Sequence, residues 1–244
     1  MLIYLEKKLF TIGRFSHVVN FLSQELSKQS PTQVILPCSL NDLAINQVSD
    51  IYKNVDYFTN DSMFLTWFFR IKHYKYAQRV YGPDLLKSFL MSEQKNSSAK
   101  KHYFLAANKY VAHKMDIFLA HKYPKLNVKI EFLPHNISKQ KEQQQLSTIL
   151  KNKPEIIWLG IGSPKQIQLA RWLKQHSRGA KVFCVGAAFD FVSGNKYQSP
   201  QWMQYSGLEW FFRLITEPRR LWRRYLINIP KYLIQLAWRQ IRVK

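Results

Sequence analysis

The sequence contains few cysteines, and their positions exclude several kinds of site. Of its 244 residues, only Cys38 and Cys184 are cysteines. They lie far apart and match neither a zinc-ligand spacing nor a disulfide framework. We therefore interpret both as small, buried apolar residues of a protein from a reducing compartment. None of the seven histidines stands at a metal-ligand spacing from another ligand type, so we expect neither a metal nor a cofactor.

Long apolar runs are missing as well. No uncharged apolar stretch reaches the ~18 residues that a membrane-spanning helix requires. The first apolar run is interrupted by Glu6, Lys7 and Lys8, which does not fit the pattern of a secretory signal. If the protein meets a membrane, we expect it to lie on the surface.

Acidic residues are scarce, whereas basic residues are abundant. The chain has 37 lysines and arginines against 15 aspartates and glutamates, which gives a net charge of +22. Such a charge favours polyanionic partners: nucleic acid, anionic lipid headgroups or phosphorylated substrates. Composition does not choose among the three. With 46% hydrophobic and 15% aromatic residues, the chain is expected to fold as one compact domain with an appendage.

Strand-like and helix-like segments alternate through most of the chain. Short apolar runs that favour strands stand at residues 34–36, 55–59, 103–106, 128–132, 155–160 and 182–185. Helical patterns lie between several of them, as at residues 164–175. The alternation predicts an α/β fold with a parallel sheet covered on both faces, in which ligands bind at the carboxyl ends of the strands. We place this core at residues 1–205 and an appendage at residues 206–244.

The segment 155–166 is the first candidate for a ligand site. A buried strand leads into Gly160 and Gly162, and Ser163 and Pro164 then suit the N-cap and the first position of a helix. Glycines let a ligand approach the backbone, and the N–H groups of a helix start attract anions such as a pyrophosphate. An ordinary strand-to-helix turn is the alternative, and Gly-x-Gly alone does not decide between them.

Two aspartates follow predicted strands. Asp61 comes after the strand at residues 55–59, and Asp190 after the strand at residues 182–185. A carboxylate at such a strand end can face a cleft and act as a general base. A turn or helix-capping aspartate is the simpler interpretation of each, and the residues alone favour it.

The C-terminal segment is strongly basic. From Pro218 onward there is no acid, and the basic residues are Arg219, Arg220, Arg223, Arg224, Lys231, Arg239, Arg242 and Lys244. Tryptophan, tyrosine and leucine alternate with them, which is typical of an amphipathic helix at a membrane surface. Pro218 and Pro230 are expected to divide the segment. Arg213, Arg220 and Arg223 would lie close to one face of a helix and suit phosphate oxygens. A solvated helix packed on the core and a nucleic-acid-binding arm are the alternatives.

Ordered short motifs along the chain resemble those of one enzyme family. Residues 160–166, Gly-Ile-Gly-Ser-Pro-Lys-Gln, are similar to the signature G-x-G-x-P-K-Q-E of the WecG/TagA/CpsF glycosyltransferases. Further similar motifs stand at residues 39–41, 61–63, 79–84, 185–190, 193–194, 199–200, 207–210, 213–214, 217–218, 220 and 223–225. The resemblance covers nearly the whole chain and is densest between residues 155 and 225.

The resemblance implies an inverting, metal-independent glycosyltransferase with a Rossmann-like α/β core and a basic, helical, membrane-docking appendage. It implies transfer of N-acetylmannosamine, its uronic acid or a related hexose from a UDP-sugar to an undecaprenyl-diphosphate-linked sugar acceptor. Such enzymes contribute to teichoic acid or exopolysaccharide synthesis, as peripheral proteins at the cytoplasmic face of the bacterial inner membrane. The implied partners are these substrates and an anionic membrane surface, but no nucleic acid. The oligomeric state stays open, a homo-oligomer included.

The resemblance also implies roles for individual residues. Asp61 would be the base that deprotonates the acceptor hydroxyl. The arginines that contact the diphosphates would be Arg213, Arg220 and Arg223, and they would stabilise the negative charge of the departing UDP. The residues that line the sugar and acceptor pocket would be Ser39, Asn41 and Gln166. The residues that shape the nucleotide-sugar site would be Arg79, Gly82, Gly160 and Gly162. Further substrate contacts would come from Asp190 and Glu209.

The chain departs from the family pattern at four places. Ser62 replaces the glycine after the aspartate, and Ile167 replaces the acid of P-K-Q-E. Ala106 and Ala107 stand where a glycine turn is expected, and the stretch between Asn41 and Asp61 is several residues shorter than the family pattern. These departures leave the donor sugar, the acceptor and the linkage open. An inactive family member that acts as a scaffold and a basic nucleic-acid-binding protein are the alternative hypotheses.

Overall fold

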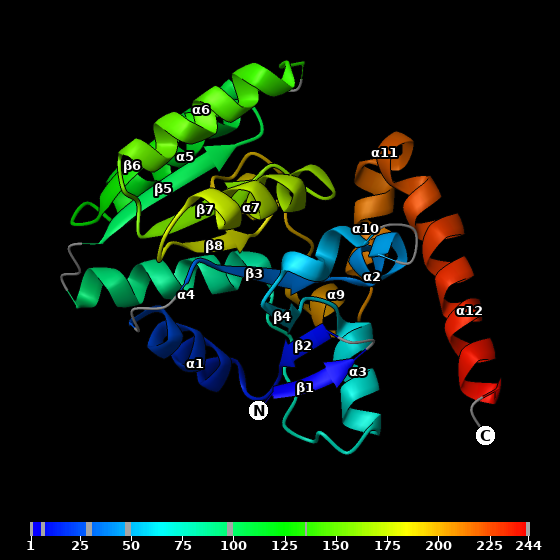
Figure 1. Cartoon of the computed structure of the whole chain (residues 1–244). Helices are drawn as coiled ribbons and strands as arrows, with labels where there is room; N and C mark the ends of the chain where they lie inside the picture. The colour runs from blue at the N-terminus through cyan, green and yellow to red at the C-terminus, as the bar shows by residue number, and fades with distance from the viewer. Residues whose placement is uncertain are drawn as a thin grey trace.

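The structure is a computed structural model of the chain (Figure 1). It describes residues 2–5, 8–27, 31–46, 50–96, 100–134 and 136–242. Lys244 of the basic C-terminal segment lies outside these residues, and the side chains of Arg239 and Arg242 are not described.

In the described part of the chain, eight strands form one sheet in the order β1-β2-β4-β3-β8-β7-β5-β6. Their bounds are Leu2–Leu5, Lys8–Thr11, Gln33–Cys38, Tyr57–Asn60, Lys101–Ala106, Asn127–Phe132, Ile156–Gly160 and Lys181–Cys184, from β1 to β8. All pairings are parallel except that of β1 with β2, at the edge of the sheet. The predicted α/β fold with a parallel sheet is therefore confirmed, whereas β1 and β2 were not predicted.

Helices cover both faces of the sheet. Successive side chains of each strand point to opposite faces, so a central strand contributes to two apolar clusters. In β7, Ile156 and Trp158 belong to one apolar cluster, and Ile157 and Leu159 belong to the other. The first cluster includes residues of α1 (Phe15–Ser27), α4 (Gly82–Lys95), α5 (Lys109–Lys122) and α8 (Ala188–Val192). The second includes residues of α2 (Leu40–Asn46), η1 (Asp50–Asn54), α3 (Met63–Ile71), α6 (Lys139–Lys151) and α7 (Lys165–His176).

The loop after β7 differs in detail from its prediction. Helix α7 begins at Lys165, so that Pro164 occupies the N-cap position and Ser163 makes no capping hydrogen bond. The side chain of Gln166 braces the loop instead: its Oε1 accepts from the Gly162 N–H at 3.2 Å, and its Nε2 donates to Ser163 Oγ at 3.2 Å. The prediction that Ser163 caps the helix is thus wrong, because the Gln166 amide forms the hydrogen bonds with the polar groups of this loop.

The C-terminal segment consists of short helices that end in a long one. These elements are α9 (Gln201–Tyr205), α10 (Glu209–Thr216), α11 (Pro218–Arg223), the π-helical turn η2 (Arg224–Asn228) and α12 (Ile229–Arg242). Pro218 begins α11 as expected, but Pro230 does not interrupt the helical path. Proline lacks an N–H and crowds the carbonyl four residues earlier, and the wider π-helical turn just before Pro230 relieves this crowding.

This segment packs on the core rather than extending from it. Figure 1 shows α12 beside α2, and the two helices are in contact. The side chain of Tyr232 from α12 is 2% exposed and joins the same apolar cluster as residues of α2 and α3. No described helix is long and apolar enough to cross a membrane.

Candidate active site

A cavity of about 500 Å³ lies between the carboxyl ends of β3 and β4, helix α3 and the C-terminal segment. It opens at the carboxyl ends of two neighbouring parallel strands, where ligands of α/β sheets usually bind. The predicted site residues that line the cavity are Ser39, Asn41, Asp61, Arg79, Glu209 and Arg213.

Asp61 is held at the end of β4 by its backbone and its side chain. Its N–H donates to the Cys38 carbonyl at 2.9 Å, and its Oδ1 accepts from the Gly82 N–H at 3.3 Å. The side chain is 24% exposed, and Oδ1 lies 3.8 Å from Arg79 Nη2. Burial, reinforced by the negative charge of Glu209 and opposed by Arg79, raises the pKa of Asp61 to about 7. A carboxyl group with this pKa takes up and releases protons readily near neutral pH.

Arg79 is fixed by its neighbours. Its Nε donates to the Asp61 carbonyl at 2.7 Å, and its Nη2 lies 2.6 Å from Glu209 Oε2. Its guanidinium lies 4.0 Å from the centre of the Tyr81 ring, and the Tyr81 hydroxyl donates to Glu209 Oε1 at 3.2 Å. Burial opposes the charge of Arg79, but Asp61 and Glu209 outweigh it and the pKa of the guanidinium is raised. Arg79 is therefore a rigid cation whose charge is shared with protein carboxylates.

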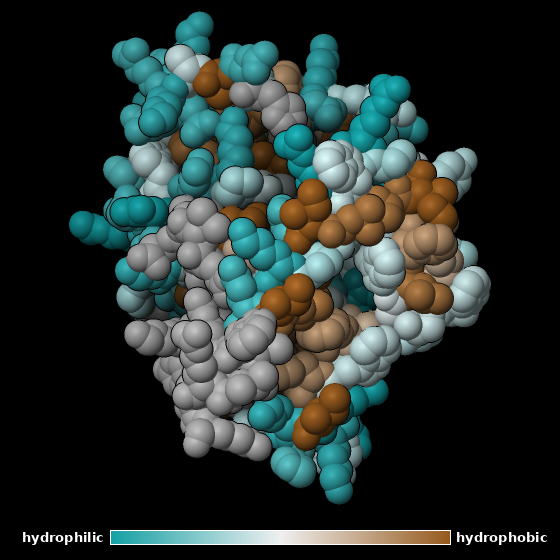
Figure 2. Space-filling model, turned by 90° about the vertical axis from the view of Figure 1, so that its right-hand side faces the viewer, coloured by the Kyte–Doolittle hydropathy of each residue, from teal (hydrophilic) through white to brown (hydrophobic). Residues whose placement is uncertain are grey.

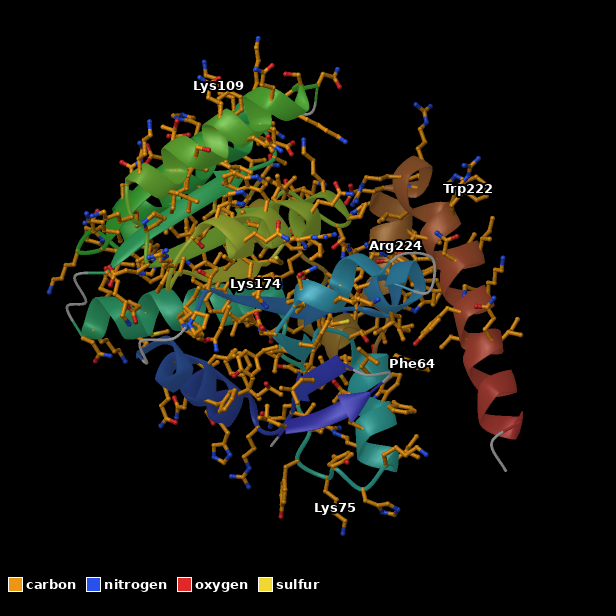
Figure 3. All side chains as sticks on the ribbon, viewed as in Figure 1. Phe64, Lys75, Lys109, Lys174, Trp222 and Arg224 are labelled. Atoms are coloured by element: carbon orange, nitrogen blue, oxygen red, sulfur yellow. The ribbon has the colours of Figure 1, made fainter. Side chains whose placement is uncertain are left out.

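Two further arginines face the cavity, and they pair less closely with protein carboxylates than Arg79 does. Arg213 comes from α10 and stacks 5.5 Å from the Phe191 ring, whereas Arg224 comes from η2 and donates from Nη2 to Ser39 Oγ at 3.2 Å. Figure 3 shows Arg224 where the C-terminal segment meets the core. The Nε atom of each arginine is buried and has no hydrogen-bond partner among the described residues. Buried donors without partners are costly, so the two arginines are well placed to receive an anion.

The loop after β3 is held by a carboxylate. Ser39 accepts from Arg224 and donates from Oγ to Asp42 Oδ2 at 2.6 Å, and the Tyr52 hydroxyl donates to Asp42 Oδ1 at 3.1 Å. Asp42 is 7% exposed. This chain of hydrogen bonds fixes the cavity wall to which the C-terminal segment is attached.

Comparison with known proteins identifies the family of the chain. The model of the glycosyl transferase WecG/TagA/CpsF family matches residues 9–244. The chain belongs to the WecG/TagA/CpsF glycosyltransferase family. It is 26% identical over 185 residues to the N-acetylglucosaminyldiphosphoundecaprenol N-acetyl-beta-D-mannosaminyltransferase of Bacillus subtilis, covering 76% of this chain and 70% of that protein. It is 28% identical over 156 residues to the enzyme of the same name from Bacillus spizizenii, covering 64% of this chain and 58% of that protein.

Several residues that the WecG/TagA/CpsF resemblance singled out lie outside the cavity lining. Gly160 packs against the Phe189 ring, which occupies the space that a Cβ would need, so the lack of a side chain allows this packing. Gln166 is 4% exposed and uses its amide within the loop. Asp190 accepts from Asn195 Nδ2 at 2.6 Å. Gly82 contributes through the N–H that reaches Asp61, whereas Gly162 has a positive φ of 95°, which favours glycine.

The arginines of the C-terminal segment divide differently from the prediction. Of Arg213, Arg220 and Arg223, only Arg213 lines the cavity. Arg220 is exposed and donates to Glu217 Oε2 at 2.7 Å, and Arg223 lies over the Trp222 ring at 5.2 Å. Arg224 lines the cavity but was named only as one of the basic residues of the tail. The three predicted arginines do not share a helix face, because α10 ends before Pro218.

The departures from the WecG/TagA/CpsF pattern fit the structure locally. Ser62 caps α3, its Oγ accepting from the Leu65 N–H at 3.2 Å, so that a serine is well suited to this position. Ile167 is 1% exposed and packs in the core, and Ala106 ends β5 with no exposed surface. Among the described residues, no three histidines, cysteines, aspartates or glutamates are grouped as metal ligands.

Proposed function

We propose that this glycosyltransferase moves N-acetylmannosamine or a related hexose from a UDP-sugar to an undecaprenyl-diphosphate-linked N-acetylglucosamine. The names of the two Bacillus relatives describe this acceptor and this sugar. The observation that carries the proposal is the position of Asp61. Its carboxyl group, with a pKa of about 7, lines the same cavity as Arg213 and Arg224.

The proposed reaction is a single displacement. Asp61 takes the proton of the acceptor hydroxyl while that oxygen attacks the anomeric carbon of the donor sugar. The bond from this carbon to the UDP oxygen breaks on the opposite side, the electron pair leaves with UDP, and the anomeric configuration inverts. Arg213 and Arg224 supply positive charge to the cavity, which offsets the negative charge of the diphosphate groups in the transition state. Arg79 and the Gly82 N–H hold Asp61 in place.

The surface around the C-terminal segment favours contact with an anionic membrane. Apolar side chains are exposed on its helices, among them Trp202 at 63%, Ile215 at 63% and Trp222 at 42%. Figure 2 shows such side chains gathered around a recess on this face of the molecule. Exposed arginines lie close by on α11. Apolar and basic side chains together are what an interfacial segment needs, and we place the protein at the cytoplasmic face of the membrane.

The test is an assay of Asp61→Asn with UDP-N-acetylmannosamine and a short-chain lipid-diphosphate N-acetylglucosamine acceptor. We expect turnover to fall at least ~100-fold, the usual contribution of a general base, while calorimetric binding of the UDP-sugar is retained. Asp116→Asn, at an exposed carboxylate on α5 outside the cavity lining, is the control and is expected to keep its activity. Full turnover by Asp61→Asn would remove Asp61 as the base. Absence of turnover by the wild-type protein with every UDP-sugar would favour the inactive scaffold.

A further inference from the structure

The cavity has a wall that the displacement reaction does not use. Three of its side chains come from α3 (Met63, Phe64 and Trp67), and three come from η2 and α12 (Leu226, Ile229 and Leu233). None carries a charge, and the aliphatic members offer no hydrogen bond to a sugar. Phe64 is labelled in Figure 3, on the side of α3 that faces the C-terminal segment.

Part of this wall is open to solvent. Phe64 is 39% exposed, Trp67 42% and Leu226 57%. Trp67 is nevertheless fixed, because its ring lies against Gly207, a residue with a positive φ of 73° at which a side chain would collide with that ring. An exposed, preformed apolar wall is a site for a hydrophobic ligand.

The charge next to this wall restricts what the ligand is. Arg213 and Arg224 line the same cavity, and each has a buried Nε without a hydrogen-bond partner among the described residues. The complementary ligand is thus an amphiphile that carries a diphosphate directly beside a hydrocarbon chain. A sugar nucleotide lacks the hydrocarbon, and a free fatty acid lacks the diphosphate.

We propose that Met63, Phe64, Trp67, Leu226, Ile229 and Leu233 form a subsite for the first isoprene units of the acceptor's polyprenyl chain. The inference rests on the proposed function and adds a specificity determinant to it. The protein then recognises the lipid itself, and the membrane surface is not the only element that selects lipid-linked acceptors. Burial of a large apolar side chain against the chain is worth about 1.5–3 kcal/mol, which corresponds to roughly 10- to 100-fold in affinity.

The test uses acceptors in solution, without vesicles, so that membrane docking makes no contribution. N-acetylglucosamine diphosphate is supplied as its methyl ester and as its farnesyl ester. For the wild-type protein we expect KM to be roughly 10- to 100-fold lower for the farnesyl ester, with kcat within about threefold, because the chain binds equally in the ground and transition states. The double variant Phe64→Ser/Leu226→Ser should lose most of this preference. Ile117→Ser, at an apolar residue on α5 that is about as exposed as Leu226, is the control and should keep it.

Other outcomes assign the wall differently. Equal KM values for the two esters in the wild-type protein would overturn the proposal. An equal loss on both esters in the double variant would assign the wall to the sugars. Dimerisation that Phe64→Ser abolishes, seen by sedimentation, would assign it to a second copy of the chain.

A binding experiment separates this proposal from the proposed function. If the wild-type protein turns over no donor, calorimetry with farnesyl diphosphate and with pyrophosphate still tests the subsite. Tighter binding of farnesyl diphosphate, reduced by Phe64→Ser/Leu226→Ser, would support the subsite even if the transferase reaction failed. Equal binding of the two ligands would refute it.

Discussion

The pKa of Asp61 predicts the pH dependence of the reaction and its response to one substitution. A base works in its deprotonated form, so kcat/KM should fall as the pH drops through about 7, where Asp61 takes up its proton. Glu209 lies next to Arg79 and raises the pKa of Asp61 by its negative charge. Glu209→Gln removes this charge and keeps an oxygen that can accept from Tyr81. It should therefore move the acid limb of the pH profile to lower pH.

The structure sets the size of this shift. Asp61 Oδ1 and Glu209 Oε2 lie 3.8 and 2.6 Å from the same Arg79 Nη2 atom, so the two oxygens are within about 6.5 Å of each other. Unit charges at this distance interact by roughly 1–3 kcal/mol at an effective dielectric constant of about 20–40. Because 1.36 kcal/mol corresponds to one pKa unit, the apparent pKa should fall by about one to two units.

The assay measures kcat/KM from initial rates between pH 5 and 9. The values of each variant are divided by its own plateau at high pH, so that a pH-independent change in substrate binding does not affect the comparison. At pH 6 the wild-type protein should retain about a tenth of its plateau activity, and Glu209→Gln about half or more. Glu131→Gln, on β6 away from the cavity, is the control and should leave the profile in place. An unchanged acid limb in Glu209→Gln would refute the assignment of that limb to Asp61.

Three further substitutions test the active site and the residues that hold it in place. Asp61→Asn should raise the free energy of unfolding by about 1–4 kcal/mol at pH 8 and by less at pH 4. The reason is that the raised pKa of Asp61 makes the protein less stable as the pH rises towards about 7. An equal gain at both pH values in urea titrations would contradict this. Arg224→Ala should lower kcat/KM by roughly 10- to 100-fold, the range for a hydrogen bond to a charged group, and more than Arg223→Ala does; the reverse order in parallel assays would show that Arg223 binds the phosphates. Gly160→Ala should destabilise the fold by about 1–3 kcal/mol, because its Cβ meets the Phe189 ring; an unchanged urea midpoint would show that the ring yields.

Local sequence patterns predicted the sheet well where strands are buried on both faces. Strands were predicted at the short apolar runs 155–160 and 182–185. Strands β7 and β8 form there, and all their residues are buried. The first two strands were missed, because Leu2–Leu5 and Lys8–Thr11 are short and separated by charged residues. At the edge of a sheet such a pair needs no continuous apolar run.

The arginines of the C-terminal segment show where local spacing fails. Arg213, Arg220 and Arg223 have helical spacing only if one regular helix contains all three. Glu217 instead separates α10 from α11 with a non-helical φ of −135° and ψ of 55°, and the π-helical turn η2 starts at Arg224. No signal next to Arg224 in the sequence distinguishes it from Arg223. Its contact with Ser39 across the cavity does.

The sequence by itself determined the fold class and the family, and it singled out Asp61, Arg79, Glu209 and Arg213 through motifs whose residues are near one another along the chain. The tertiary structure decided which of these side chains meet. Tyr81 and Glu209 are 128 residues apart, and Ser39 and Arg224 are 185 apart, yet each pair is hydrogen-bonded. Periodicity reports only whether a residue faces the core or solvent. The partners of a polar side chain, and therefore its pKa, depend on the order of strands in the sheet and on where the C-terminal helices pack.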